Sequence, residues 1–232
     1  MAINNVSFLV IWIFFIQSVG EINGWRAIDI LALDGFVALS YGITFSIFVG
    51  IKLLPQYVAD GVFDRFLLSP KNVLLRVATS AFHASAVGDF VFGVACFGIY
   101  AWVVDIHITQ LMILFLLTIN ATVMFFVVSV LIYSASFYFT DAYSVTYSLF
   151  DLFMTPTLFH GGLFHGTMRF IFTFLIPSLV IGALPTEILA SVSVVHMLVL
   201  MGITAVWFAG AMWFFRHSIK RYESANFMTF GR

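Results

Sequence analysis

The sequence predicts a helical integral membrane protein, because it is strongly apolar, carries little charge and places its apolar residues in long runs. Hydrophobic residues make up 62% of the 232 positions and charged residues only 9%, whereas soluble domains contain about 45–50% apolar and about 25% charged residues. A helix needs about 20 apolar residues to cross a bilayer. The short alternating segments typical of transmembrane β-barrels are absent from the sequence, so we interpret the runs as helices.

Six apolar runs are predicted to be membrane spans. They cover residues 2–20, 30–54, 78–104, 110–135, 143–164 and 192–215. The first run is not preceded by basic residues and has no cleavage site of small residues, so we predict a span and not a signal peptide. It is short and lacks the usual flanking Lys or Arg, which leaves open a further N-terminal segment.

A seventh apolar run, residues 168–190, is interrupted by Pro177, Gly182 and Pro185. Proline removes a helical hydrogen bond and glycine lowers helix propensity, so a continuous span is not expected here. We predict that this run enters and leaves the membrane on one side as a re-entrant helical hairpin, whose backbone groups are satisfied by surrounding protein. The alternative is two broken but ordinary spans.

The distribution of basic residues supports the hairpin. Four of the ten basic residues lie in residues 52–76, four lie in residues 216–232, and only Arg26 and Arg169 lie elsewhere. The positive-inside rule places both clusters in the cytoplasm. Five apolar runs separate the clusters, and five crossings would put them on opposite sides, so one run must not cross. The prediction is six spans with both termini cytoplasmic, Trp25 and Arg26 at the outer interface, and the hairpin on the outer side between the fifth and sixth spans.

Motifs for ATP binding and for the common hydrolases are absent from the sequence. A Walker A loop requires Gly-Lys, but Lys52, Lys71 and Lys220 follow Ile, Pro and Ile. Neither HExxH nor GxSxG occurs. The single cysteine, Cys96, excludes an internal disulfide and a cysteine metal cluster. We therefore expect that the chain is not an enzyme and binds no cofactor or metal of its own.

Charged residues gather in a short segment between the second and third apolar runs. Residues 56–68 are predicted to form one amphipathic helix that begins after Pro55 and ends before Pro70. At 100° per residue, one face carries Val58, Ala59, Val62, Phe63 and Phe66, and the other carries Asp60, Gly61, Asp64 and Arg65. The helix is too short and too charged to span, so we expect it at the cytoplasmic surface. Its acidic residues match an anionic lipid surface poorly, which favours docking of a cytoplasmic protein over lipid anchoring.

The same segment resembles a known family. The pattern Gly61-x-Phe63-Asp64-x-x-Leu67-Leu68-x-Pro70 is similar to the signature G-x-L-D-x-x-L-L-x-P in the first cytoplasmic loop of bacterial ABC exporter permeases of the second type (ABC-2), in the branch that includes viologen exporters. Three further matches occur in the order of that family: Gly24-Trp25, Phe174-x-x-Pro177 with Pro185, and Arg221-Tyr222-x-Ser224-Ala225. The chain departs from the family in having Phe63 where Leu is usual and in lacking an amphipathic helix before the first span.

The resemblance implies the transmembrane subunit of an ATP-driven exporter in the bacterial inner membrane. Two permeases would form the substrate pathway, with a heterodimer favoured over a homodimer, and separate ATPase subunits would bind ATP and Mg²⁺. The coupling helix would dock on the ATPase through Asp60, Gly61, Phe63, Asp64, Arg65 and Pro70. The substrate would be an amphipathic or lipophilic small molecule or a peptide, and no nucleic acid partner is expected. The outer hairpin would close the pathway.

Three acidic residues within the predicted spans are candidates for the substrate pathway: Asp89, Asp151 and Asp34. Ionisable groups inside a membrane are costly and are often functional, although each can also be a carboxyl satisfied by a neighbouring helix. Asp89 is predicted midway along the third span, beside a line of small residues that would allow close helix packing, Ser80, Ala84 and Gly88. The alternative function is an ion-coupled secondary transporter that uses Asp89 and Asp151. Such folds usually contain paired broken helices in repeated halves, and the sequence shows only one broken segment.

The junction between the fifth span and the hairpin is the predicted outer gate. Gly161 and Gly162 lie there between His160 and His165. The two histidines are five residues apart and do not share a helix face, so a metal pair is not expected. The preferred interpretation is a flexible gate formed by His160, Gly161, Gly162, Pro177 and Pro185.

Overall fold

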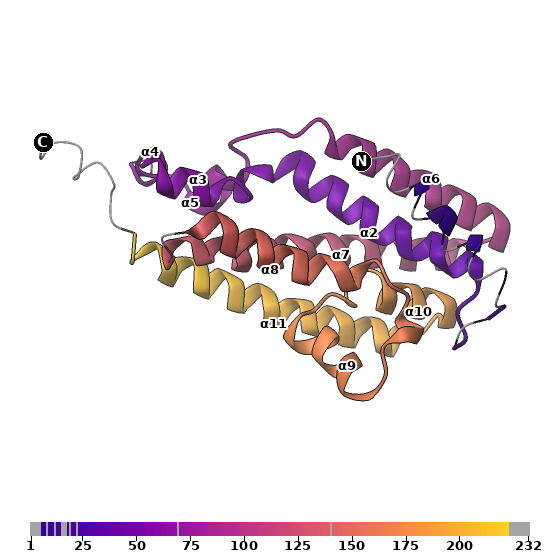
Figure 1. The fold of residues 1–232 in the computed structure, drawn as a ribbon. Coiled ribbons are helices and arrows are strands. Elements are labelled where there is room, and N and C mark those ends of the chain that lie inside the picture. The colour runs from indigo at the N-terminus through magenta and orange to yellow at the C-terminus, as the bar shows by residue number, and fades with distance from the viewer. Residues whose placement is uncertain are drawn as a thin grey trace, which may run out of the picture.

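The elements that the structure describes are all helical, and most of them run lengthwise in one bundle (Figure 1). The structure is a computed structural model. It describes residues 6–7, 9–11, 13–14, 18, 20–21, 23–68, 70–139 and 141–222. The first predicted span, residues 2–20, lies largely outside the described residues.

Among the described residues, four helices are long and apolar enough to cross a membrane. They are α2 (Ala27–Ile47), α6 (Ala86–Val104), α7 (Ile108–Ser134) and α11 (Val194–Ile219). The fifth predicted span forms a shorter helix, α8 (Ala142–Thr157), which has 16 residues. The third span begins later than predicted, because residues 79–85 are not helical. The second span ends earlier, at Ile47, where the short 3-10 helix η1 (Val49–Ile51) follows it.

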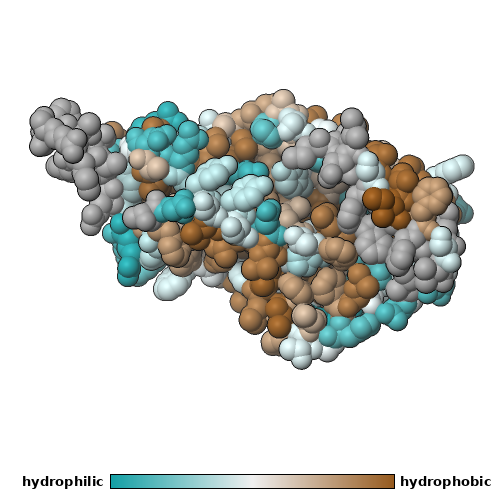
Figure 2. All heavy atoms as spheres, viewed as in Figure 1, coloured by the Kyte–Doolittle hydropathy of each residue, from teal (hydrophilic) through white to brown (hydrophobic). Residues whose placement is uncertain are grey.

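The two ends of the bundle differ in composition. The basic end is formed by α3 (Leu54–Ala59), α4 (Asp64–Leu67), α5 (Val73–Ala78) and the C-terminal end of α11 (Figure 1). The hairpin end is formed by α9 (Gly166–Phe170), α10 (Ala183–Ser191) and the N-terminal end of α11. Figure 2 shows hydrophilic residues gathered over α3, α4 and α5. The two basic clusters of the sequence therefore lie at the same end of the bundle, as far as residue 221.

Helices α2 and α6 approach each other closely because each has glycine at the contact. A Cβ on Gly42 of α2 would collide with the backbone of Phe90, and a Cβ on Gly93 of α6 would lie 2.6 Å from the backbone nitrogen of Leu39. Small residues let membrane helices approach in this way. The small-residue line predicted for this purpose was wrong: Ser80 and Ala84 precede α6, and a Cβ on Gly88 would have no neighbour within 4 Å.

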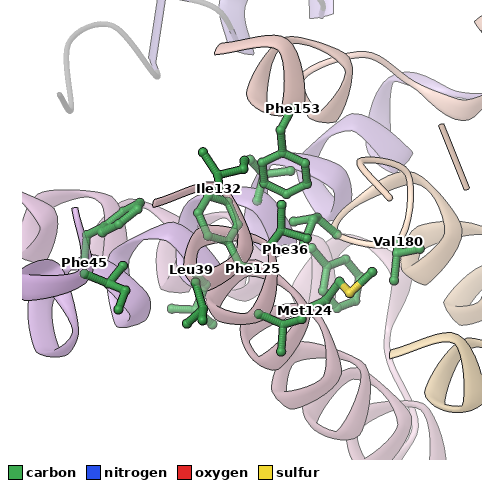
Figure 3. Packing of buried hydrophobic residues seen from close by; sticks show 14 of the residues in the cluster. Phe36, Leu39, Phe45, Met124, Phe125, Ile132, Phe153 and Val180 are labelled. Atoms are coloured by element: carbon green, nitrogen blue, oxygen red, sulfur yellow. The ribbon is translucent and has the colours of Figure 1, made fainter. Parts of the chain in front are cut away.

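Aromatic rings fill the centre of the bundle. Phe45 of α2 lies edge-on to Phe125 of α7, with ring centroids 5.7 Å apart, and Phe125 lies 5.6 Å from Phe153 of α8. Figure 3 shows these rings beside Phe36, Leu39, Met124, Ile132 and Val180. Edge-to-face pairs at such distances add to the stabilisation from burial alone. The core therefore joins α2, α7 and α8 and includes the turn of the hairpin.

The predicted coupling helix over residues 56–68 is divided into two. Pro55 lies in the first turn of α3, as the sequence predicts, but α3 ends at Ala59 and α4 begins at Asp64. Gly61 has a φ of +68°, a left-handed conformation that glycine adopts without strain. The backbone N–H of Phe63 then donates to Tyr57 O at 2.9 Å, which closes the corner. A helical wheel drawn for one continuous helix over residues 56–68 therefore assigns some side chains to the wrong face.

The interrupted run 168–190 forms two helical limbs joined by a buried turn. The first limb is α9 followed by a π-helical turn, η4 (Ile171–Leu175), and the second is α10. Residues 176–182 connect them, and the N–H of Leu179 donates to Phe172 O at 3.0 Å. Pro177 and Gly182 lie in this turn, but Pro185 does not interrupt α10. It lies in the first turn of that helix, where the absent N–H would have no helical partner.

Candidate functional site

The α3–α4 corner at the basic end presents some of the predicted docking residues and buries others. Asp60, Arg65 and Pro70 are exposed, and Asp64 is half-buried. Gly61 is buried, and Phe63 is completely buried. Since a partner reaches only exposed groups, the buried Gly61 and Phe63 can shape the corner but cannot contact a partner directly.

Phe63 connects the corner to two distant parts of the chain. Its ring lies 5.1 Å from that of Phe137 and 4.9 Å from that of Tyr222, both edge-on. Phe137 ends the short helix η2 (Ala135–Phe137), which continues α7 toward α8, and Tyr222 follows α11. One side chain thus joins the corner to the C-terminal ends of two long helices, α7 and α11.

Arg76 holds α4 from the neighbouring helix α5. Its Nη1 donates to Phe66 O at 3.0 Å and to Arg65 O at 3.3 Å, carbonyls near the end of α4. The guanidinium carbon lies 5.5 Å from the centroid of Phe66, and that of Arg65 lies 4.8 Å from the same ring. Sequence reasoning assigned Arg76 to membrane topology alone, because nothing in its spacing indicates a contact with residue 66.

Lys52 lies between the corner and the aromatic core. Its Nζ is 5.4 Å from the ring centroid of Phe45 and 5.6 Å from that of Phe150 in α8. Burial lowers the pKa of Lys52, and the nearby Asp151 partly opposes this change. Lys52 is a second residue that the sequence identified only as a topological charge.

The three candidate acids do not form a cluster. Asp89 lies in the first turn of α6, and not midway along it, because that helix begins at Ala86. It is buried, as is Asp34 in α2, whose Oδ2 makes no hydrogen bond to the described residues. Asp151 is exposed on α8.

One face of α8 points away from the bundle and carries polar groups. Tyr143, Tyr147, Asp151 and Thr155 follow one another at intervals of four residues, and all four are exposed. That spacing places them on one side of the helix. The rings of Tyr143 and Tyr147 stack with centroids 6.3 Å apart. We term these four residues the α8 face.

The predicted gate residues His160, Gly161 and Gly162 pack under Trp25 at the hairpin end. All are buried, and the rings of Trp25 and His160 lie 5.6 Å apart. A Cβ on Gly162 would lie 3.0 Å from Trp25 Cδ1, so glycine serves close packing at this position. Asn23 Nδ2 donates to Gly162 O at 2.7 Å. The glycines therefore lie in a packed contact, not in an open loop.

An ion pair joins the two limbs of the hairpin. Arg169 of α9 binds Glu187 of α10 through its two terminal guanidinium nitrogens, and Nη1 lies 3.2 Å from Oε1. The two residues lie nine positions before and nine positions after Ser178. A hairpin that is symmetrical about Ser178 therefore places them opposite each other. A second ion pair, Arg26 with Asp29 at 3.2 Å, caps α2 at the same end, and its hydrogen bond raises the pKa of Arg26.

Metal ligands are not grouped in the described part of the chain, where no three His, Cys, Asp or Glu side chains could hold an ion. Comparison with curated proteins and with solved structures finds no match. The family model described as ABC-2 family transporter protein matches residues 2–226, nearly the whole chain. With its long apolar helices, the chain is a multi-pass membrane protein that belongs to the ABC-2 transporter family.

Proposed function

We propose that the chain is the permease subunit of an ATP-driven exporter, powered by separate ATPase subunits. The observation that carries this proposal is the α3–α4 corner, which exposes Asp60 and Arg65 while Phe63 anchors it to the helix ends. Family membership supports a permease, and the sequence has no Walker A lysine. Energy from ATP would therefore enter through a partner at this corner.

The contacts of Phe63 suggest how motion at the corner would reach the membrane helices. A partner that displaces α4 would push the buried ring against Phe137 and Tyr222. Packed rings resist compression, so the displacement would pass to η2 and to the end of α11. The ATPase would then contact Asp60, Asp64, Arg65 and Pro70. Gly61 would shape the turn of the corner, and Phe63 would transmit the displacement.

The α8 face supports a pathway shared with a second permease. A carboxylate such as Asp151 is costly against acyl chains, so its exposure on the side of the bundle favours contact with protein or water. Tyr143, Tyr147 and Thr155 would line the same surface, suited to an amphipathic small molecule or a peptide. The sequence resemblance favours a different permease over a second copy of this chain.

The orientation that we propose places the basic end in the cytoplasm of a bacterial cell, together with both termini. This follows the positive-inside rule, since the basic clusters share one end. The hairpin limbs would then be re-entrant from the outer side. Each limb has about ten residues and measures roughly 15 Å at 1.5 Å per residue, about half of the hydrocarbon thickness. The Arg169 and Glu187 pair would hold the hairpin closed.

Ion-coupled transport through Asp89 and Asp151 is not favoured. The first carboxyl is buried in the first turn of α6, and the second is exposed on α8. A coupling site usually brings its ligands together at one place near the midplane. The separate surroundings of the two acids do not match that requirement.

The docking proposal is tested by reversing charges at the corner. Asp60→Lys combined with Arg65→Glu keeps the net charge of the exposed surface but exchanges its pattern. We expect loss of co-purification with the ATPase subunit and loss of ATP-dependent transport in membrane vesicles. Arg216→Glu, at an exposed position of α11 at the same end, controls for a change of surface charge away from the corner and should leave association intact. Unchanged association in the double variant would refute docking at this surface.

A further inference from the structure

A groove of about 720 Å³ lies between the hairpin limbs and the first half of α11. Its walls are mainly apolar and come from α9 and η4, from α10 and from α11: Phe170, Phe174, Leu184, Ile188, Val199 and Ile203. Phe170, Phe174 and Val199 are exposed, so the groove is open on the side of the bundle. In a membrane, such a surface meets acyl chains and not water.

The end of the groove nearest the hairpin end is polar. Arg169, Glu187 and His196 line it there. A smaller recess of about 400 Å³ lies beside Trp25, and Arg169 and Glu187 line that recess as well. The ion pair thus separates a small polar recess from a long apolar groove. A polar recess beside a long apolar groove is complementary to an amphiphile that has a polar head and an apolar chain.

The charges at the junction favour a particular headgroup. Arg169 and Glu187 lie side by side, and their side chains are 39% and 31% exposed. Together they carry no net charge, but they present a cation and an anion to a ligand. A zwitterionic headgroup matches both, with its phosphate beside the guanidinium and its ammonium beside the carboxylate. A purely anionic headgroup would gain one contact and meet repulsion from Glu187.

The length of the groove matches part of one leaflet. His196 lines its polar end and Ile203 lines its apolar wall, both on α11. Seven residues of helix correspond to roughly 10 Å, about a third of the hydrocarbon core of about 30 Å. A chain lying in the groove would therefore remain within the leaflet next to the hairpin end.

We propose that this groove binds one acyl chain of a zwitterionic glycerophospholipid, with the headgroup at Arg169 and Glu187. The assignment to the outer leaflet rests on the proposed orientation, whereas the binding itself does not require the ATPase. A bound lipid would pack against both limbs and thereby hold the hairpin against α11. The lipid would be a resident structural component, distinct from any substrate on the α8 face.

Lipid retention by the purified chain tests the proposal. The chain is reconstituted in mixed micelles of phosphatidylethanolamine and phosphatidylglycerol, and bound lipid is counted by native mass spectrometry. We expect preferential retention of phosphatidylethanolamine. Val199→Trp, which fills the groove, should reduce this retention by about tenfold. Val206→Trp is the matched control, because Val206 is 73% exposed on the same helix outside the groove.

The headgroup is tested separately from the chain. Arg169→Gln with Glu187→Gln removes both charges at nearly constant shape and should abolish the preference for phosphatidylethanolamine while leaving some lipid bound. Equal loss from Val199→Trp and Val206→Trp would mean non-specific surface lipid and would overturn the proposal. Equal retention of phosphatidylglycerol by the unaltered chain would overturn the headgroup assignment.

Two measurements keep the test independent of variant folding and of the exporter proposal. A phosphatidylethanolamine with a photoreactive acyl chain should crosslink the unaltered protein within residues 166–203. Val199→Cys in a Cys96→Ser background should not form a disulfide between subunits, and formation of one would show that protein covers the groove. ATPase association, measured on the same samples, should not change when lipid binding is lost.

Discussion

The basic end and the hairpin end are stabilised by different chemistry. At the basic end, aromatic rings and guanidinium groups surround Phe63 and Phe66. At the hairpin end, an ion pair between partly exposed side chains joins the two limbs. Ring packing resists displacement in every direction, whereas an exposed ion pair opens at a cost of about 1 kcal/mol or less. Under the proposed function, the first end would transmit a displacement, whereas the ion pair of the second end would be a contact that can open.

Of the changes considered at either end, removal of the Phe63 ring should cause the largest loss of stability. Phe63→Ala leaves a cavity in a fully buried site and removes the contacts to Phe137 and Tyr222. We expect a loss of about 3–5 kcal/mol of stability and loss of ATP-dependent transport, with the exposed docking residues still in place. Thermal unfolding in detergent and vesicle transport measure the two effects.

The control for this variant is Leu68→Ala, because Leu68 is 87% exposed in the same corner. It should leave stability near that of the unaltered protein. Full transport activity in Phe63→Ala would contradict the role of the ring in transmission.

Arg76→Gln should weaken the same end by a smaller amount. The change removes a charged donor from the carbonyls of Phe66 and Arg65, and hydrogen bonds to charged groups contribute about 1.5–3 kcal/mol. We expect a lower unfolding temperature and weaker ATPase association. Arg216→Gln removes an equal charge from the basic end and serves as the control. If both variants behave alike, Arg76 acts only through its charge.

At the hairpin end, separation of the ion pair should change access more than stability. Glu187→Gln leaves Arg169 without its carboxylate, and a partly exposed pair contributes only about 0–1 kcal/mol. We expect faster thiol labelling at Thr173→Cys, whose position is buried in η4 of the first limb, with little change in unfolding temperature. The exchange Arg169→Glu with Glu187→Arg should restore slow labelling. Slow labelling in Glu187→Gln would indicate that packing alone closes this end.

The smallest expected effect concerns Lys52. Burial lowers its pKa below the ordinary 10.5, so protonation of Lys52 is more costly in the folded chain than in the unfolded chain. This penalty is absent above about pH 10.5, grows as the pH falls from there toward the lowered pKa, and is complete below it. Lys52→Met should therefore be slightly more stable at pH 7, and the difference should shrink toward pH 10. A difference that does not change with pH would assign the effect to packing.

The corner at residues 54–68 shows where sequence reasoning succeeded and where it failed. The amphipathic pattern correctly indicated a short surface element with Phe63 and Phe66 turned inward. It assumed one continuous helix, and the left-handed Gly61 turns the chain at that point. Whether a glycine adopts a positive φ depends on contacts made later in the chain, so composition could not predict it.

Asp89 and the pair of Arg169 with Glu187 show a second limit. The depth of Asp89 was misjudged because hydropathy does not mark where a helix begins, and residues 79–85 contain no Asp, Glu, Lys or Arg to end the predicted span. The pair joins residues 18 positions apart in two short limbs. Its formation requires the hairpin turn, and a linear scan of charges contains no such information.

The sequence by itself determined that the chain lies in a membrane, which segments are apolar, where charge is concentrated and that the ATP motif is absent. These properties depend on residues that are close together in the sequence, so they can be recognised from the sequence alone. Only the tertiary structure decided that Phe63 is an anchor, that Gly42 and Gly93 join α2 to α6, and that the hairpin and α11 enclose a groove. Those properties depend on contacts between distant residues, which backbone turns and close helix approach establish.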